Sequence, residues 1–198
     1  MSNVRTNTRS RRVVVAVAGA ALTLVLAACT APTPPTTTTT TSSTVPSCVP
    51  EPATLTQGSV TLTVSQVTCL EVGDEVAVTG SGYTATGNIG TRFPLPGQPA
   101  GVYVAFGEFA DNWRYSESAP SSARKILSQM WALPSPSFEN MGGGAGLTHL
   151  AADGTFSTTL TISEAQGANP NLAFVTYAGS GAVNPAEELF IPASWLAE

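Results

Sequence analysis

The sequence predicts an all-β protein: an antiparallel β-sandwich of about seven strands with one short helix. Between residues 60 and 191, short segments alternate apolar and polar side chains with a period of two. This is the pattern of strands that bury one face and expose the other to water. Glycine, asparagine and aspartate separate the segments, as is usual at turns. Six or seven such strands in one domain are typical of a sandwich.

The individual strands follow from the alternating apolar positions. In chain order these sets are Val60, Leu62 and Val64; Val76 and Val78; Val102, Val104 and Phe106; Phe156, Leu160 and Ile162; Ala173, Val175 and Tyr177; Leu189 and Ile191. The pair Asp153-Gly154 precedes one of them and predicts a hairpin turn. The short helix is predicted over residues 121–131, where apolar residues recur at helical spacing.

The first 28 residues have the features of a secretory signal. Four arginines, at positions 5, 9, 11 and 12, precede an uncharged stretch. At about 15 residues this stretch is shorter than the ~20 that a membrane span needs. A basic head, a short apolar middle and small residues before the cut predict that residues 1–28 are a signal peptide removed on export.

The run Leu26-Ala27-Ala28-Cys29 resembles the lipobox of bacterial lipoproteins. In that family the cysteine receives a diacylglyceryl group, the chain is cut before it, and the new amine can be acylated, commonly with palmitate. The resemblance implies that Cys29 is the lipid attachment site and that the protein sits on the outer face of the cell membrane. An uncleaved anchor, or an ordinary signal cut elsewhere, is the alternative.

Residues 29–47 are predicted to be a linker between the lipid and a folded domain. After Cys29 this stretch is almost entirely Thr, Pro and Ser. It has little to bury and cannot offset the entropy of ordering. The remaining residues, 48–198, form one predicted domain that is large enough for a hydrophobic core.

The charge of the exported chain limits its partners. Removal of the signal leaves four basic residues against all 13 acidic ones, for a formal charge of about −9. Such a surface repels phosphate backbones, which argues against nucleic acid. The expected partners are the membrane, through the lipid, and another envelope protein or a cell-wall component.

Cysteine usage agrees with an oxidising compartment. With Cys29 assigned to lipid, Cys48 and Cys69 remain as an even pair, and we expect a disulfide between them. Such a bridge contributes roughly 3 kcal/mol in the chain-entropy model. Two separate thiols are the alternative. Two distant cysteines and one histidine make a poor ligand set, so neither a metal nor another cofactor is expected.

Parts of the folded region are similar to known surface domains. Residues 76–83 (VAVTGSGY) look like the opening of immunoglobulin-like domains on actinobacterial surfaces, which neocarzinostatin-like folds share. Residues 101–104 (GVYV), followed by Trp113 and residues 118–120 (SAP), are similar to a segment of surface proteins that also carry heme-binding HtaA-type domains. The resemblance covers residues 55–193 and implies an Ig-like sandwich of seven strands. It implies no catalytic residue, and no heme-binding domain is recognisable.

Catalytic motifs are incomplete. His149 is the sole histidine, and no Gly-x-Ser-x-Gly elbow surrounds a serine. Ser122 and Lys125 match the Ser-x-x-Lys of penicillin-interacting enzymes, but the Ser-Asp-Asn and Lys-Thr-Gly elements are missing. A serine that caps the predicted helix explains this match better. The sequence therefore predicts no enzyme.

One segment, residues 108–137, is longer than a sandwich requires. It combines aromatic residues with three of the four basic residues of the exported chain, and such combinations anchor interfaces. The candidate contact face consists of Phe109, Trp113, Arg114, Tyr115 and Trp131. A cap that covers one open end of the sandwich is the alternative.

Three functions follow, in decreasing order. The first is a membrane-anchored, non-enzymatic binding or structural module of the cell envelope. The second is a surface protein that binds a small ligand, heme or another apolar molecule, in a crevice lined by Tyr103, Trp113, Tyr115 and His149. The third is a cell-wall hydrolase that depends on His149.

Overall fold

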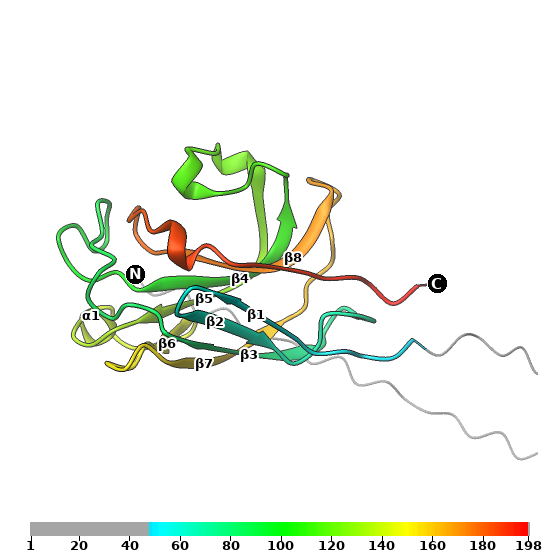
Figure 1. Ribbon diagram of the computed structural model, residues 1–198, viewed down its shortest axis with the longest axis horizontal. Helices are drawn as coiled ribbons and strands as arrows, with labels where there is room; N and C mark the ends of the chain where they lie inside the picture. Colours follow the sequence, from blue (N-terminus) through cyan, green and yellow to red (C-terminus); the bar gives the residue numbers. More distant parts are fainter. Residues whose placement is uncertain (1–47, 198) are drawn as a thin grey trace, which may run out of the picture. The chain divides into compact units, whose positions relative to one another are not determined.

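The computed structural model describes residues 48–197, which form a sandwich of two β-sheets (Figure 1). The predicted signal peptide (1–28), the lipid site Cys29 and the linker (29–47) lie outside these residues. No helix within residues 48–197 is long and apolar enough to cross a membrane.

The smaller sheet has the order β1-β2-β3-β7, and the larger sheet has the order β6-β5-β4-β8-β9. The strands of the smaller sheet are β1 (Ala53–Gln57), β2 (Val60–Val64), β3 (Glu75–Ser81) and β7 (Phe156–Thr161). Those of the larger sheet are β4 (Val102–Phe109), β5 (Arg124–Leu133), β6 (Leu147–His149), β8 (Asn171–Ala178) and β9 (Phe190–Pro192). The helical pieces are α1 (Ser137–Asn140) and the 3₁₀ turns η1 (Tyr115–Glu117), η2 (Ser121–Ala123) and η3 (Pro185–Glu187).

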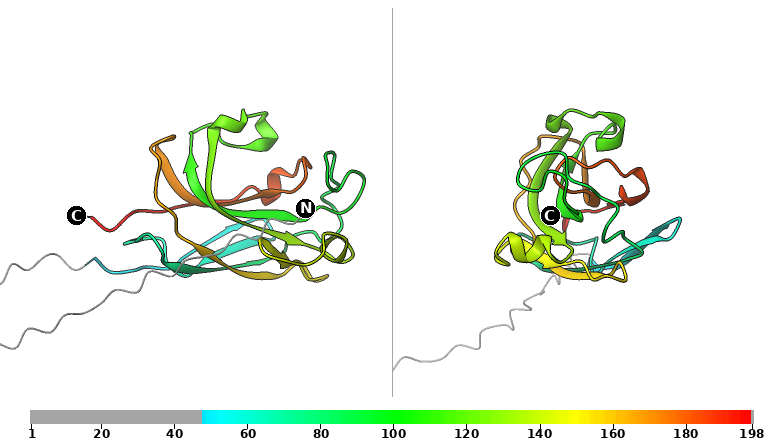
Figure 2. Two further views of the ribbon diagram at one scale, coloured as in Figure 1. Left: turned by 180° about the vertical axis from the view of Figure 1, so that it is seen from behind. Right: turned by 90° about the vertical axis from the view of Figure 1, so that its left-hand side faces the viewer.

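The predicted fold class is confirmed. Strands β2, β3 and β7 in one sheet and β4, β8 and β9 in the other follow the A-B-E and C-F-G order of the immunoglobulin fold. All pairings between named strands are antiparallel except that of β5 with β6. Figure 2 shows the two sheets stacked, seen from two further sides. The described residues contain nine strands rather than about seven, because β1, β5 and β6 were not expected.

The main core lies between the two sheets, where the alternating apolar positions meet. Leu62 and Val78 from the smaller sheet and Phe106 and Phe174 from the larger sheet are all buried there. Their neighbours along β2 and β3 point outward. Period-two patterning therefore located most strands correctly, because one face of each strand in the smaller sheet meets water.

The expected helix over 121–131 is wrong: the chain forms only the turn η2 and then strand β5. The apolar residues of β5 lie on both faces of the sheet, since Met130 packs against the main core and Ile126 against a second cluster outside it. A register shift opposite Phe106 and Gly107 leaves Leu127 as an extra residue. Two covered faces and a bulge abolish the period of two and imitate helical spacing.

The predicted disulfide joins Cys48 to Cys69, with their Cα atoms 5.7 Å apart. It ties the beginning of the described chain to the segment that follows β2. The turn at Asp153 is also present: the amide and hydroxyl of Thr155 both donate to the Asp153 carboxylate.

Candidate ligand-binding cleft

A second hydrophobic cluster covers the outer face of the larger sheet. Ala105 and Phe109 of β4 and Val175 of β8 point away from the main core, and Trp113 closes over them. The rings of Phe109 and Trp113 lie 5.7 Å apart in an edge-to-face arrangement. The connection between β4 and β5, residues 110–123, thus lies over this face (Figure 1).

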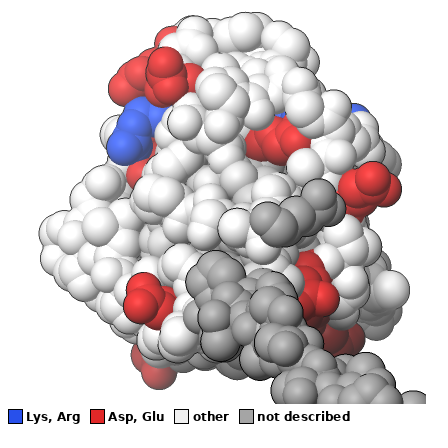
Figure 3. Space-filling model, turned by 90° about the vertical axis from the view of Figure 1, so that its right-hand side faces the viewer, with Lys and Arg blue, Asp and Glu red and all other residues white. Residues whose placement is uncertain are grey.

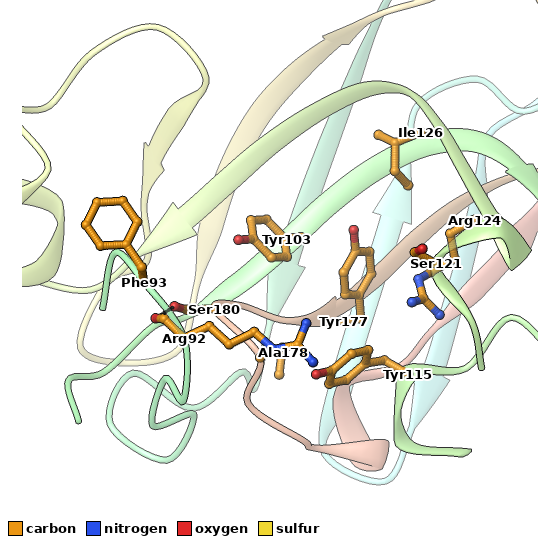
Figure 4. A pocket seen from close by; sticks show the side chains of 11 residues that line it. Arg92, Phe93, Tyr103, Tyr115, Ser121, Arg124, Ile126, Tyr177, Ala178 and Ser180 are labelled. Atoms are coloured by element: carbon orange, nitrogen blue, oxygen red, sulfur yellow. Dashed lines mark hydrogen bonds between the residues drawn. The ribbon is translucent and has the colours of Figure 1, made fainter. Parts of the chain in front are cut away.

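Beside this cluster the same face is hollowed into a cleft of about 320 Å³ (Figure 4). We call it the tyrosine–arginine cleft. Its floor comes from three strands, which supply Tyr103, Tyr177, Ile126 and Arg124. Its walls come from the β3–β4 loop, with Arg92 and Phe93, from the β4–β5 connection, with Tyr115 and Ser121, and from the turn after β8.

The tyrosines of the floor are neutral hydrogen-bonding groups. Tyr103 and Tyr177 are partners in the pairing of β4 with β8, and their ring centroids are 5.3 Å apart. Burial raises the pKa of both, and raises that of Tyr177 to about 12. At physiological pH both hydroxyls therefore keep their protons.

Two guanidinium groups lie against one aromatic ring in this cleft. The Cζ atoms of Arg92 and Arg124 are 5.7 and 5.5 Å from the ring centroid of Tyr115, which is cation–π distance. Arg124 is already engaged, because its Nη1 donates to the Trp113 carbonyl at 2.6 Å. Arg92 has no carboxylate within 4 Å among the described residues, where both ion pairs involve Arg114.

The cleft is a positive site on an acidic protein. None of the described residues that line it is acidic, while two are arginines. On the face shown in Figure 3, acidic side chains are scattered over the surface and basic ones appear only in its upper part. The local charge of the cleft therefore has the opposite sign to the net charge of the chain.

Two consecutive buried glutamates hold the loops on either side of the cleft. Glu187 accepts hydrogen bonds from the backbone amide of Thr84 and the side-chain amide of Asn88, both at 2.6 Å. Glu188 accepts from the backbone amide of Ser116 at 2.7 Å and from its hydroxyl. Because the β3–β4 loop carries Arg92 and the β4–β5 connection carries Tyr115, this acidic pair positions both walls.

The two glutamates are 2% and 1% exposed, so their hydrogen bonds are needed to offset the cost of burial. Burial raises the pKa of Glu187, although the bonds from Thr84 and Asn88 act in the opposite direction. Glu188 also lies 3.9 Å from Arg114 Nη1, the same atom that donates to its backbone carbonyl.

Most of the predicted contact face is buried. Phe109, Trp113 and Trp131 are 0%, 4% and 7% exposed, and only Arg114 and Tyr115 reach the surface in part. The aromatic residues are needed inside because the outer face of the larger sheet has its own core. Residues 108–137 are likewise no single long loop, since β5 occupies a third of them. The alternative of a cap is closer, but the connection covers a sheet face rather than an open end.

The predicted four-residue crevice does not exist as one site. Tyr103 and Tyr115 share the tyrosine–arginine cleft. Trp113 borders a different hollow, and His149 a third, where its ring stacks on Phe138 at 4.1 Å. A heme held jointly by these four residues is therefore not supported.

Sequence reasoning missed the participation of Arg92, Arg124 and Tyr177. Arg92 lies in a proline-rich loop with no motif around it, and Tyr177 was interpreted only as a strand position. The one available signal was that most basic residues lie in or beside aromatic segments. The described residues contain no group of three His, Cys, Asp or Glu side chains that is able to hold a metal ion. No family model, curated protein or solved structure matches the chain.

Proposed function

We propose that this protein is an exported envelope lipoprotein, anchored through Cys29, whose sandwich domain binds a small ligand without converting it. The binding site is the tyrosine–arginine cleft. This proposal keeps the envelope-exposed binding module that the sequence predicts. It replaces the expected aromatic contact face with a site that the structure assembles.

The observation that carries the proposal is the unpaired guanidinium of Arg92 at the edge of an aromatic hollow. Ligand sites are usually concave and mainly apolar, with a few polar groups that fix orientation. The cleft has this composition, since tyrosine rings and Ile126 surround the two arginines. Glu187 and Glu188 anchor both walls, which supports a site formed before the ligand arrives.

The chemistry of the lining favours binding over catalysis. A general acid or base works best with a pKa near the operating pH. The ionisable side chains that line the cleft are arginines and tyrosines, and burial raises the pKa of Tyr103 and Tyr177 further from neutrality. None of these groups readily exchanges a proton at neutral pH.

The envelope setting is supported by the signal-like N-terminus and by the disulfide, because such bonds persist outside the cytosol. The resemblance to immunoglobulin-like domains of actinobacterial surface proteins agrees with this setting and belongs to the proposal.

Native mass spectrometry tests the proposal on protein extracted from its own cells in mild detergent. We expect an acyl mass on Cys29 and a discrete additional mass that leaves on unfolding. Ser121→Trp fills the cleft from an exposed position on its rim, so it should remove the additional mass and keep the lipid. Lys125→Gln removes a charge outside the cleft and should keep both. Retention of the ligand by the Ser121→Trp protein would place the binding site elsewhere.

A further inference from the structure

We infer that the ligand of the cleft is a flat aromatic ring bearing one carboxylate, an inference that rests on the proposed function. Arg92 is the group that pairs with the carboxylate. Arg124 supplies charge but few free donors, because its terminal nitrogens donate to the carbonyls of Trp113 and Ala119. One open guanidinium fork matches the two oxygens of a single carboxylate.

Arg92 is aimed into the cleft by its contacts with the turn that follows β8. Its backbone amide donates to the Ser180 carbonyl at 3.0 Å, and the Ser180 hydroxyl donates to the carbonyl of Arg92 (Figure 4). Its aliphatic stem crosses Gly181, where a Cβ atom would lie 3.0 Å from both Cγ and Cδ of Arg92. Gly181 also has a φ of +78°, which favours glycine. It is therefore a positioning residue for Arg92.

The remaining lining fits a flat apolar body. The rings of Tyr103, Tyr115 and Tyr177 present aromatic surface, and Ile126 adds an aliphatic contact. Phe93 is 91% exposed at the rim, an unusual position for a large apolar ring that a bound ligand would cover. The protonated tyrosine hydroxyls act as additional donors toward a negative charge.

Size and charge exclude bulkier anions. A volume of about 320 Å³ is near the lower end of small-molecule sites. The acidic surface around the cleft repels polyanions, whereas one negative charge is matched by the local pair of arginines. An aromatic monocarboxylate satisfies both limits.

Isothermal titration calorimetry tests this ligand class with two probes of the same shape, 2-naphthoate and its neutral amide, 2-naphthamide. The full-length protein is used in mild detergent, and each probe is also titrated into detergent alone. We expect the acid to bind at least about tenfold more tightly than the amide, the scale of a charged hydrogen bond. Inorganic phosphate at the same concentration should not displace the acid.

Variants of the aiming device should separate charge from shape. Arg92→Gln should reduce binding of the acid to the level of the amide, and Arg92→Lys should restore part of it. Gly181→Ala should weaken the acid and leave the amide unchanged, because it moves the guanidinium and not the rings. Lys125→Gln, which removes the same charge outside the cleft, should leave both affinities unchanged.

The outcomes distinguish the ligand class from the site itself. Equal affinity for acid and amide, displacement by phosphate, an unaffected Arg92→Gln protein, or no binding of either probe would overturn the aromatic carboxylate. If Ser121→Trp abolishes binding of both probes in any of the first three cases, the cleft remains the site and only the class is wrong. If Ser121→Trp leaves both probe binding and the native additional mass unchanged, the proposed function fails with it.

Discussion

The outer faces of the two sheets follow opposite rules. On the smaller sheet the outward positions are small hydroxyl residues exposed to water or partly so, and facing pairs such as Thr54 with Thr63 hydrogen-bond at 3.0 Å. On the larger sheet the outward positions are aromatic or aliphatic, and the β4–β5 connection covers them. A sheet with one wet face needs only one core, whereas a sheet with two dry faces can enclose a cleft at the edge of its cover.

The largest expected effect comes from removing the cover. Trp113→Ala should lower the free energy of unfolding by about 3–5 kcal/mol, the usual range for loss of a buried large aromatic side chain. Thr79→Ala, on the exposed face of the smaller sheet, should change it by only about 0.5 kcal/mol or less. Urea unfolding of both variants against the parent measures the difference. Equal effects would mean that the second cluster is no real core.

An intermediate effect is expected from releasing one wall of the cleft. Glu188→Ala deprives the amide and hydroxyl of Ser116 of their acceptor and should cost about 1–3 kcal/mol of stability. Amide hydrogen exchange should become faster in residues 114–117 and remain slow in β2 and β3. Unchanged exchange in the connection would show that Glu188 does not position it.

The smallest effects are those of pH, and they have opposite signs at two buried glutamates. Glu108 is buried, which by itself raises its pKa, but backbone amides of residues 166–168 donate to it at 2.7 Å and lower the pKa below its ordinary value of 4.5. Its contribution to stability is therefore present above about pH 4.5 and is lost as the pH falls through the lowered pKa. For Glu187, whose pKa is raised by burial, the contribution is present below pH 4.5 and is lost as the pH rises through the raised pKa.

Urea unfolding between pH 3 and pH 7 separates these two glutamates. The destabilisation caused by Glu108→Gln should shrink toward pH 3, when the parent is also protonated. Glu187→Gln should gain stability relative to the parent as the pH rises. A common pH dependence for both variants would contradict the assigned pKa directions.

The same contrast explains which strands the sequence predicted. In β2, β3 and β7 apolar and polar residues alternate because one face is wet, so these strands were recognised. In β5 both faces are covered and Leu127 sits in a bulge, so the pattern was mistaken for a helix. The isolated strand β6 has only three residues, which is too short for any periodic signal.

The candidate site was predicted less well than the fold. Tyr103 and Tyr115 were assigned to one crevice and do share the cleft, but Trp113 and His149 lie elsewhere. Trp113 was expected to make contacts at the surface because aromatic residues beside arginine often do so. Its role is instead to close a core that is visible only when the connection is seen over the sheet.

The sequence alone determined the all-β class, most strands and turns, and the pair of cysteines that form the disulfide, because each depends on neighbours in the chain or on simple counting. Only the tertiary structure decided the cleft. Arg92, Tyr115 and Tyr177 are far apart in the sequence, and they meet because β4 pairs with β8 and because two buried glutamates hold the intervening loops. Such proximity depends on strand register and loop anchoring, which no local pattern encodes.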